Sequence, residues 1–90
     1  MSFRKRLQSQ FAIAKKKYLK EHPNCEVCLL FGKLIPASDV HHVIGRYNTD
    51  LYLDETNFIS LCRFHHNDVM NKDGKTKQLI EKIVKRREGL

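Results

Sequence analysis

Residues 57–67 read NFISLCRFHHN, in which a short apolar run passes directly into a cysteine and two histidines. Phe58 to Leu61 has the length and the β-prone composition of a buried strand, and residues 62–70 have the pattern of a helix. Cys62 and His65 are separated by two residues, so a thiolate and an imidazole can reach one metal ion from the same turn. The stretch predicts a strand and a helix whose junction binds a metal.

Two further clusters precede this stretch, CEVC at residues 25–28 and DVHHV at residues 39–43. The first repeats the two-residue gap of the Cys62 and His65 pair, and the two pairs together supply a common ligand set for closed, tetrahedral zinc. An odd number of thiols in this arrangement favours a metal over disulfides. The alternative, thiols buried as small hydrophobic groups, leaves the paired spacing unexplained. The predicted ligands of a structural Zn²⁺ are Cys25, Cys28, Cys62 and His65.

The size and charge of the chain point to a small domain that meets a polyanion. Ninety residues bury only about 60% of their unfolded surface, so a metal or an oligomer is expected to supplement the core. The net charge of +7 is uneven: residues 1–22 carry seven Lys and Arg against one acid, residues 72–90 seven against three, and residues 23–71 three against six. Basic ends around a ligand-rich centre indicate nucleic-acid contact, and two solvated helix faces are the alternative.

Apolar spacing and chain breakers predict the remaining elements. Apolar residues at spacings of three and four line one face of a helix that Ser2 caps and that runs to about Glu21, before Pro23 ends it. A short strand is expected from Asp39 to Ile44, able to pair with the strand at 58–61. A polar loop at 45–56 and a final helix from about Thr76 to Arg87 complete the order. We expect one domain, 1–90, made of a basic helix (1–22), a zinc knuckle with the core (23–70) and a second basic helix (71–90).

The first residues carry charge with no apolar run behind them, so no signal peptide is expected. No stretch approaches the ~18 apolar residues of a membrane span. Three thiols used as metal ligands suit a reducing compartment. We therefore expect a cytoplasmic protein that does not enter membranes.

Taken together, DVHHV and NFISLCRFHHN resemble the HNH endonucleases of the His-Me finger, or ββα-metal, group. The preceding CEVC is similar to the subset of that family with a structural zinc, and the resemblance covers roughly residues 23–70. It implies an α+β fold, with a small ββα-metal core and a structural zinc flanked by N- and C-terminal basic helices. It also suggests a phage-like setting, in a bacterial or infected-host cytoplasm, with a second copy of the chain or phage packaging proteins as partners.

The resemblance assigns roles to the central residues. It makes His42 the general base that removes a proton from the attacking water, and imidazole suits this because it is mostly neutral yet basic near neutral pH. It makes His41 and His66 the holders of one catalytic divalent ion, and Asn57 the brace of the loop between the strands that helps to orient His42. Asp39 is expected on the strand face of His41, as a hydrogen-bonding partner of that ligand.

The position of His41 departs from the family, which more often has Asp there. A neutral imidazole removes a charge and softens the site, which favours Mn²⁺, Ni²⁺, Co²⁺ or Zn²⁺ over Mg²⁺. The catalytic metal is therefore one of Mg²⁺, Mn²⁺, Ni²⁺ or Zn²⁺, with the preference open. Adjacent residues on a straight strand point to opposite faces, so for His41 and His42 to serve one phosphate the strand has to end or bulge there.

The leading hypothesis is an enzyme: a metal-dependent HNH DNA endonuclease that hydrolyses phosphodiester bonds by nicking or double-strand cleavage. The main alternative is a non-catalytic, zinc-ribbon-like module that binds nucleic acid, and a third is a zinc-stapled interaction domain with no nucleic-acid partner. The loop at 45–56, with Arg46, Tyr47 and Tyr52, either touches DNA or covers the strands. The residues expected to contact DNA are Arg4, Lys5, Lys15, Lys16, Arg63, Lys82, Lys85 and Arg86.

Overall fold

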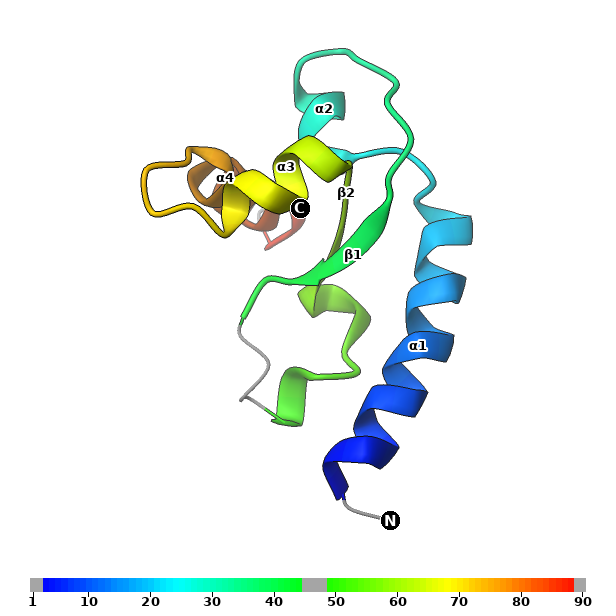
Figure 1. Ribbon diagram of the computed structural model, residues 1–90. Helices are drawn as coiled ribbons and strands as arrows, with labels where there is room; N and C mark the ends of the chain where they lie inside the picture. Colours follow the sequence, from blue (N-terminus) through cyan, green and yellow to red (C-terminus); the bar gives the residue numbers. More distant parts are fainter. Residues whose placement is uncertain (1–2, 45–48, 89–90) are drawn as a thin grey trace.

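The computed structural model describes residues 3–44 and 49–88 of the chain, and within them the fold is α+β. A two-stranded sheet lies at the centre, with α1 along one side and the other helices around the opposite side and end (Figure 1). Arg46 and Tyr47 fall outside the described residues. The elements are α1 (Phe3–Glu21), α2 (Glu26–Leu30), β1 (Asp39–His42), the short 3-10 turns η1 (Thr49–Leu51) and η2 (Glu55–Asn57), β2 (Phe58–Leu61), α3 (Arg63–Val69) and α4 (Thr76–Glu88).

The expected pairing of the two strands is confirmed, with β1 and β2 antiparallel and His42 opposite Phe58. The first strand is shorter than predicted, because it ends at His42 and not at Ile44. After His42, the Ile44 amide donates to Asn57 Oδ1 at 2.8 Å, and Asn57 Nδ2 donates back to the Ile44 carbonyl at 3.2 Å. The Val43 amide still donates to the Asn57 carbonyl at 2.8 Å, but the Asn57 amide donates to the Asp54 carbonyl at 2.9 Å, so the ladder goes no further.

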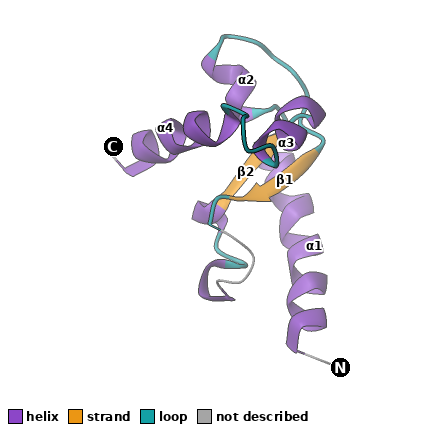
Figure 2. Ribbon diagram, turned by 60° about the vertical axis from the view of Figure 1, so that its left-hand side comes forward, coloured by secondary structure: helices purple, strands orange, loops and turns teal. Residues whose placement is uncertain are grey.

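Both faces of β2 are covered, and all four of its residues are buried. Phe58 packs with Tyr18 and Val40 on the side of α1. Ile59 and Leu61, which point the other way, pack in a second cluster that includes the three cysteines and Ile80 and Ile83 of α4. The sheet therefore separates two small cores. Figure 2 shows α1 and α4 leaving the sheet on different sides. The strand alternation of apolar side chains explains this division.

The outer edge of β2 is closed by an ion pair from two helices. Glu26 Oε2 accepts from the Ser60 amide at 2.7 Å, and Arg87 Nη1 donates to the Phe58 carbonyl at 2.9 Å. Glu26 Oε1 and Arg87 Nη2 lie 2.8 Å apart, and the Tyr18 hydroxyl donates to Glu26 Oε2 at 2.7 Å. An unpaired strand edge exposes backbone groups to other chains. Here charged side chains satisfy them and join both terminal helices to the sheet.

The turn between α3 and α4 is held by Asp68. Its Oδ2 accepts from the Thr76 amide at 3.0 Å, and hydrogen bonds from the hydroxyl and amide of Thr76 lower the pKa of this carboxyl group. Gly74 passes so close that a Cβ atom there would overlap the Asp68 carbonyl oxygen. The close approach requires glycine and sets the angle at which α4 returns to the sheet.

None of the helices in the described residues combines the length and the apolar character that crossing a membrane requires.

Candidate functional site

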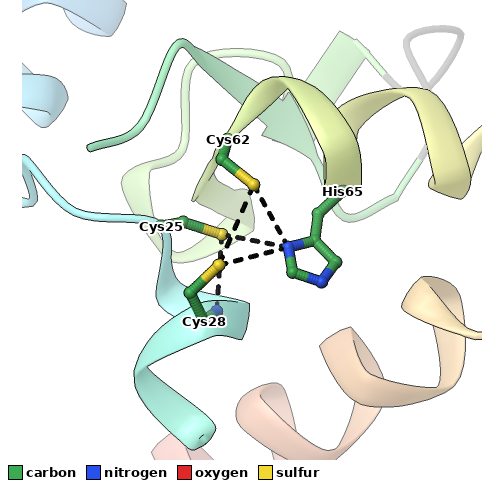
Figure 3. Close-up of side chains that lie close together, drawn as sticks. All are labelled: Cys25, Cys28, Cys62 and His65. Carbon is green, nitrogen blue, oxygen red and sulfur yellow. Dashed lines mark hydrogen bonds between the residues drawn. The ribbon is translucent and has the colours of Figure 1, made fainter. Parts of the chain in front are cut away.

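Cys25, Cys28, Cys62 and His65 form a cluster whose four ligand atoms lie within 4.8 Å of one another. The His65 Nδ1 atom lies 3.4, 3.5 and 3.3 Å from the sulfurs of Cys25, Cys28 and Cys62 in that order, and Cys28 Sγ and Cys62 Sγ are 3.8 Å apart. Figure 3 shows the four groups pointing to one centre. A zinc ion with Zn–S near 2.3 Å and Zn–N near 2.0 Å places sulfurs about 3.8 Å apart and sulfur about 3.5 Å from nitrogen. The cluster is therefore compatible with a structural zinc.

Local structure brings the four ligands together. The Cys25 sulfur caps α2 by accepting from the Cys28 amide at 3.4 Å, which turns both thiols to the same side. Cys62 is the N-cap residue of α3, and His65 lies one turn further along. The predicted convergence of these four residues is confirmed. Strand β2 ends at Leu61, so Cys62 and His65 follow directly after the strand.

The electrostatics of the cluster are compatible with a bound cation. Burial, together with the neighbouring Cys25 and Cys62, raises the pKa of Cys28 to about 12. Three thiolates at this spacing repel one another. The positive charge of a bound divalent cation offsets this repulsion and stabilises the deprotonated thiols. Burial also lowers the pKa of His65, against a smaller opposing effect of Asp68. His65 is thus neutral near pH 7, as a metal ligand has to be.

A second group of side chains gathers where β1 faces α3. The rings of His41 and His66 have their centroids 6.2 Å apart, and His66 Nε2 lies 3.7 Å from Asp39 Oδ2. Asp39 therefore faces His66 and also Lys15, whose Nζ is 3.2 Å from Asp39 Oδ1, while its expected pairing with His41 stays a prediction. Helix α3 presents His66 to the start of β1. These groups are more loosely gathered than the four zinc ligands.

His42 occupies the opposite face of β1 and is 5% exposed. Its ring packs at 4.3 Å from Phe11 and 4.7 Å from Tyr52, measured between centroids. His42 Nε2 lies 2.9 Å from the Tyr52 carbonyl oxygen, which can only accept, so Nε2 carries the proton and Nδ1 the lone pair. The fold thus selects the tautomer in which Nδ1 is the basic atom. Tyr52, in the loop at 45–56, covers the strands.

Asn57 holds the base of that loop. Besides its two bonds to Ile44, its Nδ2 donates to the Leu51 carbonyl at 3.2 Å, and its own carbonyl accepts from the Val43 amide at 2.8 Å. The side chain therefore ties the chain before the loop to the chain after it, one residue from the Tyr52 carbonyl that receives His42. This bracing arrangement is the one the sequence suggested for Asn57.

A cavity of 460 Å³ opens at the end of β1, and His41 and His42 both line it. Lys77 and Glu81 of α4 form its charged wall, with Ile80 between them. The strand ends at His42 without a bulge in the register, which is how side chains from opposite faces come to border one space. Sequence reasoning missed Lys77 and Glu81 as neighbours of the histidines. Their spacing of four residues marks one helix face but cannot show which strand that face meets.

The predicted DNA contacts are spread over three helices. Lys15 is engaged with Asp39, and Arg86 borders a different cavity, next to α2. On α4, Lys77 is therefore the described basic residue that borders the histidine cavity. Arg4 lies in α1, but its side chain is outside what the structure describes. The exposed members of the predicted set are Lys5, Lys16, Arg63, Lys82, Lys85 and Arg86.

Comparisons of this chain with protein-family models, with curated proteins and with solved structures find no match. The resemblance to HNH endonucleases therefore remains a prediction from the residues quoted above.

Proposed function

We propose that this chain is a metal-dependent DNA endonuclease with a ββα-metal core of the HNH kind, formed by β1, β2 and α3. The observation that carries the proposal is the bond of His42 Nε2 to the Tyr52 carbonyl, at 2.9 Å. A general base needs a defined tautomer and a lone pair on the atom that takes the proton. The bond to a backbone carbonyl supplies both, beside a cavity that His41 also lines.

In this proposal Cys25, Cys28, Cys62 and His65 hold a structural Zn²⁺ that joins the knuckle to α3. His41 and His66 hold the catalytic divalent ion. When bound, that ion supplies Lewis-acid contact to the scissile phosphate and stabilises the leaving 3′-oxygen.

The protein groups position and activate the water. His42 Nδ1 takes the proton of the attacking water, and the Nε2–H of the protonated ring still donates to the Tyr52 carbonyl. Asn57 holds the loop that carries Tyr52, so that the carbonyl stays aligned with the ring. Lys77, on the wall of the same cavity, contacts a phosphate of the bound strand. The basic faces of α1 and α4 add salt-sensitive contacts to the backbone.

The test is cleavage of supercoiled plasmid by zinc-loaded protein with EDTA, Mg²⁺, Mn²⁺, Ni²⁺ or Zn²⁺. The variants are His42→Ala and His42→Asn, and the second keeps an N–H donor for the Tyr52 carbonyl while removing the base. Loss of a general base is expected to slow cleavage by about 10²–10⁴-fold. His22→Ala is the matched control, because His22 stacks on Tyr18 at the end of α1, outside the cavity.

Circular dichroism and zinc content have to match the parent for each variant. A folded, zinc-loaded His42→Asn protein that cleaves as fast as the parent would refute the role of His42. A parent that binds DNA but cuts with none of these metals would refute the nuclease, and would favour a zinc-stapled module that only binds nucleic acid.

A further inference from the structure

The two histidines proposed to hold the catalytic ion are both neutral ligands. Hard divalent ions such as Mn²⁺ and Mg²⁺ prefer oxygen donors, and a carboxylate also offsets their charge. His41 and His66 alone leave that charge uncompensated. A nearby carboxylate would offset it.

Asp39 provides one. It stands two residues before His41, and strand geometry places both side chains on the same face of β1. That face meets α3, and Asp39 Oδ2 lies 3.7 Å from His66 Nε2. The Asp39 side chain is 35% exposed and that of His66 is 28% exposed, so an ion can reach both from solvent.

The separation of the two donor atoms fits a shared ion. Oxygen and nitrogen ligands at about 2.1 Å from one ion, at the tetrahedral angle, lie about 3.4 Å apart. The observed 3.7 Å is longer by a few tenths of an ångström, which small side-chain rotations remove. His41 is more distant, with its ring centroid 6.2 Å from that of His66, and joins the pair by turning its side chain.

The carboxylate of Asp39 is divided between two neighbours. Oδ1 faces the Lys15 ammonium at 3.2 Å, and Oδ2 faces His66. Oδ1 also accepts from the Val40 amide at 2.8 Å. One oxygen of the carboxylate is therefore anchored, and the other is directed to His66.

We infer that Asp39 is a third ligand of the divalent ion, completing a set of one carboxylate and two imidazoles with His41 and His66; the inference rests on the proposed role of those two histidines. With the carboxylate of Asp39, the site would bind Mn²⁺ as well as softer ions. Asp39 would then supply the negative charge that HNH endonucleases more often carry at the position of His41. The competing explanation is that Asp39 only pairs with Lys15, or orients His66 without touching the ion.

Metal titrations without DNA separate these explanations. Zinc-loaded full-length protein is titrated with Mn²⁺, with free Mn²⁺ followed by electron paramagnetic resonance, and with Ni²⁺ by calorimetry. Asp39→Asn is expected to weaken Mn²⁺ binding at least tenfold, with zinc content and melting temperature close to the parent. Asp39→His keeps three ligands and makes them softer, so Ni²⁺ binding is expected to survive within about threefold while Mn²⁺ binding is lost.

Lys15→Met is the matched control, because it breaks the same ion pair and keeps the carboxylate. It is expected to bind Mn²⁺ as tightly as the parent or more tightly. The inference is overturned if the parent binds neither ion, if Asp39→Asn binds Mn²⁺ within twofold of the parent, or if Lys15→Met loses as much affinity as Asp39→Asn. Equal losses of Mn²⁺ and Ni²⁺ in Asp39→His also overturn it, since they indicate an orienting role.

The outcome is independent of the plasmid assay. Mn²⁺ binding that depends on Asp39, with no DNA cleavage by the parent, would support the ligand set and refute the nuclease. Cleavage by a parent whose Mn²⁺ affinity does not depend on Asp39 would support the nuclease and refute the ligand.

Discussion

Replacing Glu26 by Gln tests whether the ion pair at the edge of β2 holds the fold together. Both oxygens of Glu26 accept: Oε2 from the Tyr18 hydroxyl and the Ser60 amide, and Oε1 from Arg87 Nη2. A glutamine of the same shape has one oxygen and one NH₂ group. Whichever way it is turned, its NH₂ faces a donor, and either the guanidinium of Arg87 or the buried amide of Ser60 loses its partner.

The expected loss of stability follows from the hydrogen bonds that the substitution breaks. A buried donor left without a partner costs about 1–3 kcal/mol, and a hydrogen bond to a charged group contributes about 1.5–3 kcal/mol. The side chains of Arg87 and Glu26 are 29% and 13% exposed, so solvent relieves part of the loss. We expect Glu26→Gln to lower the free energy of unfolding by about 2–4 kcal/mol. This is somewhat less than the cost of about 3–5 kcal/mol for breaking a fully buried ion pair. For a domain of this size the expected loss corresponds to about 10–25 °C in melting temperature.

The measurement is urea unfolding of zinc-loaded protein, with zinc in excess so that both variants keep the metal. Glu55→Gln is the matched control, because Glu55 pairs with Lys17 at 3.4 Å on the surface, with side chains 46% and 65% exposed. An exposed pair of this kind contributes up to about 1 kcal/mol. A Glu26→Gln protein that loses no more stability than Glu55→Gln would refute the reasoning.

Removing zinc is expected to unfold the domain, because structural zinc supplies on the order of 10 kcal/mol and a chain of this size has little other stability to lose; circular dichroism during chelator titration measures it. Acid should have the same effect. Burial lowers the pKa of His65 from its ordinary 6.5, so the stability that neutral His65 contributes is present above pH 6.5 and is lost as the pH falls through the lowered pKa. Measuring zinc retention from pH 7.5 to 5 checks this direction. Stable zinc retention through pH 5 would contradict this. Gly74→Ala is expected to destabilise by about 1–3 kcal/mol, since its Cβ overlaps the Asp68 carbonyl; Lys72→Ala in the same turn is the control, and equal unfolding midpoints would contradict the steric argument.

The cysteine and histidine cluster and the main elements could be predicted because their signals are local. Two ligands three residues apart come to one side of a single turn whatever the rest of the chain does, and the two pairs do meet. The strand at Phe58–Leu61 is correct to the residue, and the final helix to within one. Apolar periodicity and turn residues act over a few positions, which is the range that reading along a chain resolves.

The partners of charged side chains could not be predicted, because they depend on how helices pack across the sheet. Asp39 faces Lys15 of α1 and His66 of α3, and only the packing of these helices against β1 brings them to it. Glu26 and Arg87 are 61 positions apart, and only the packing of α2 and α4 on β2 joins them. Any of the chain's acids could have paired with any of its many bases, and nothing in the order of residues ranks those pairs.

The cavity at the end of β1 also combines a feature that the sequence predicts with features that only the packing of the chain determines. The HH pair of β1 marks a candidate site in the sequence, but whether both rings border one space depends on where the strand ends. That point lies at Asn57, whose backbone amide donates to the Asp54 carbonyl and whose side chain bonds to Ile44. The wall opposite the histidines, Lys77 and Glu81, is set by the angle of α4 after the Asp68 turn. Local chemistry thus specifies which residues can bind metal or accept a proton, and tertiary packing decides which of them meet, because contacts between distant segments depend on how the helices pack on the two faces of the sheet.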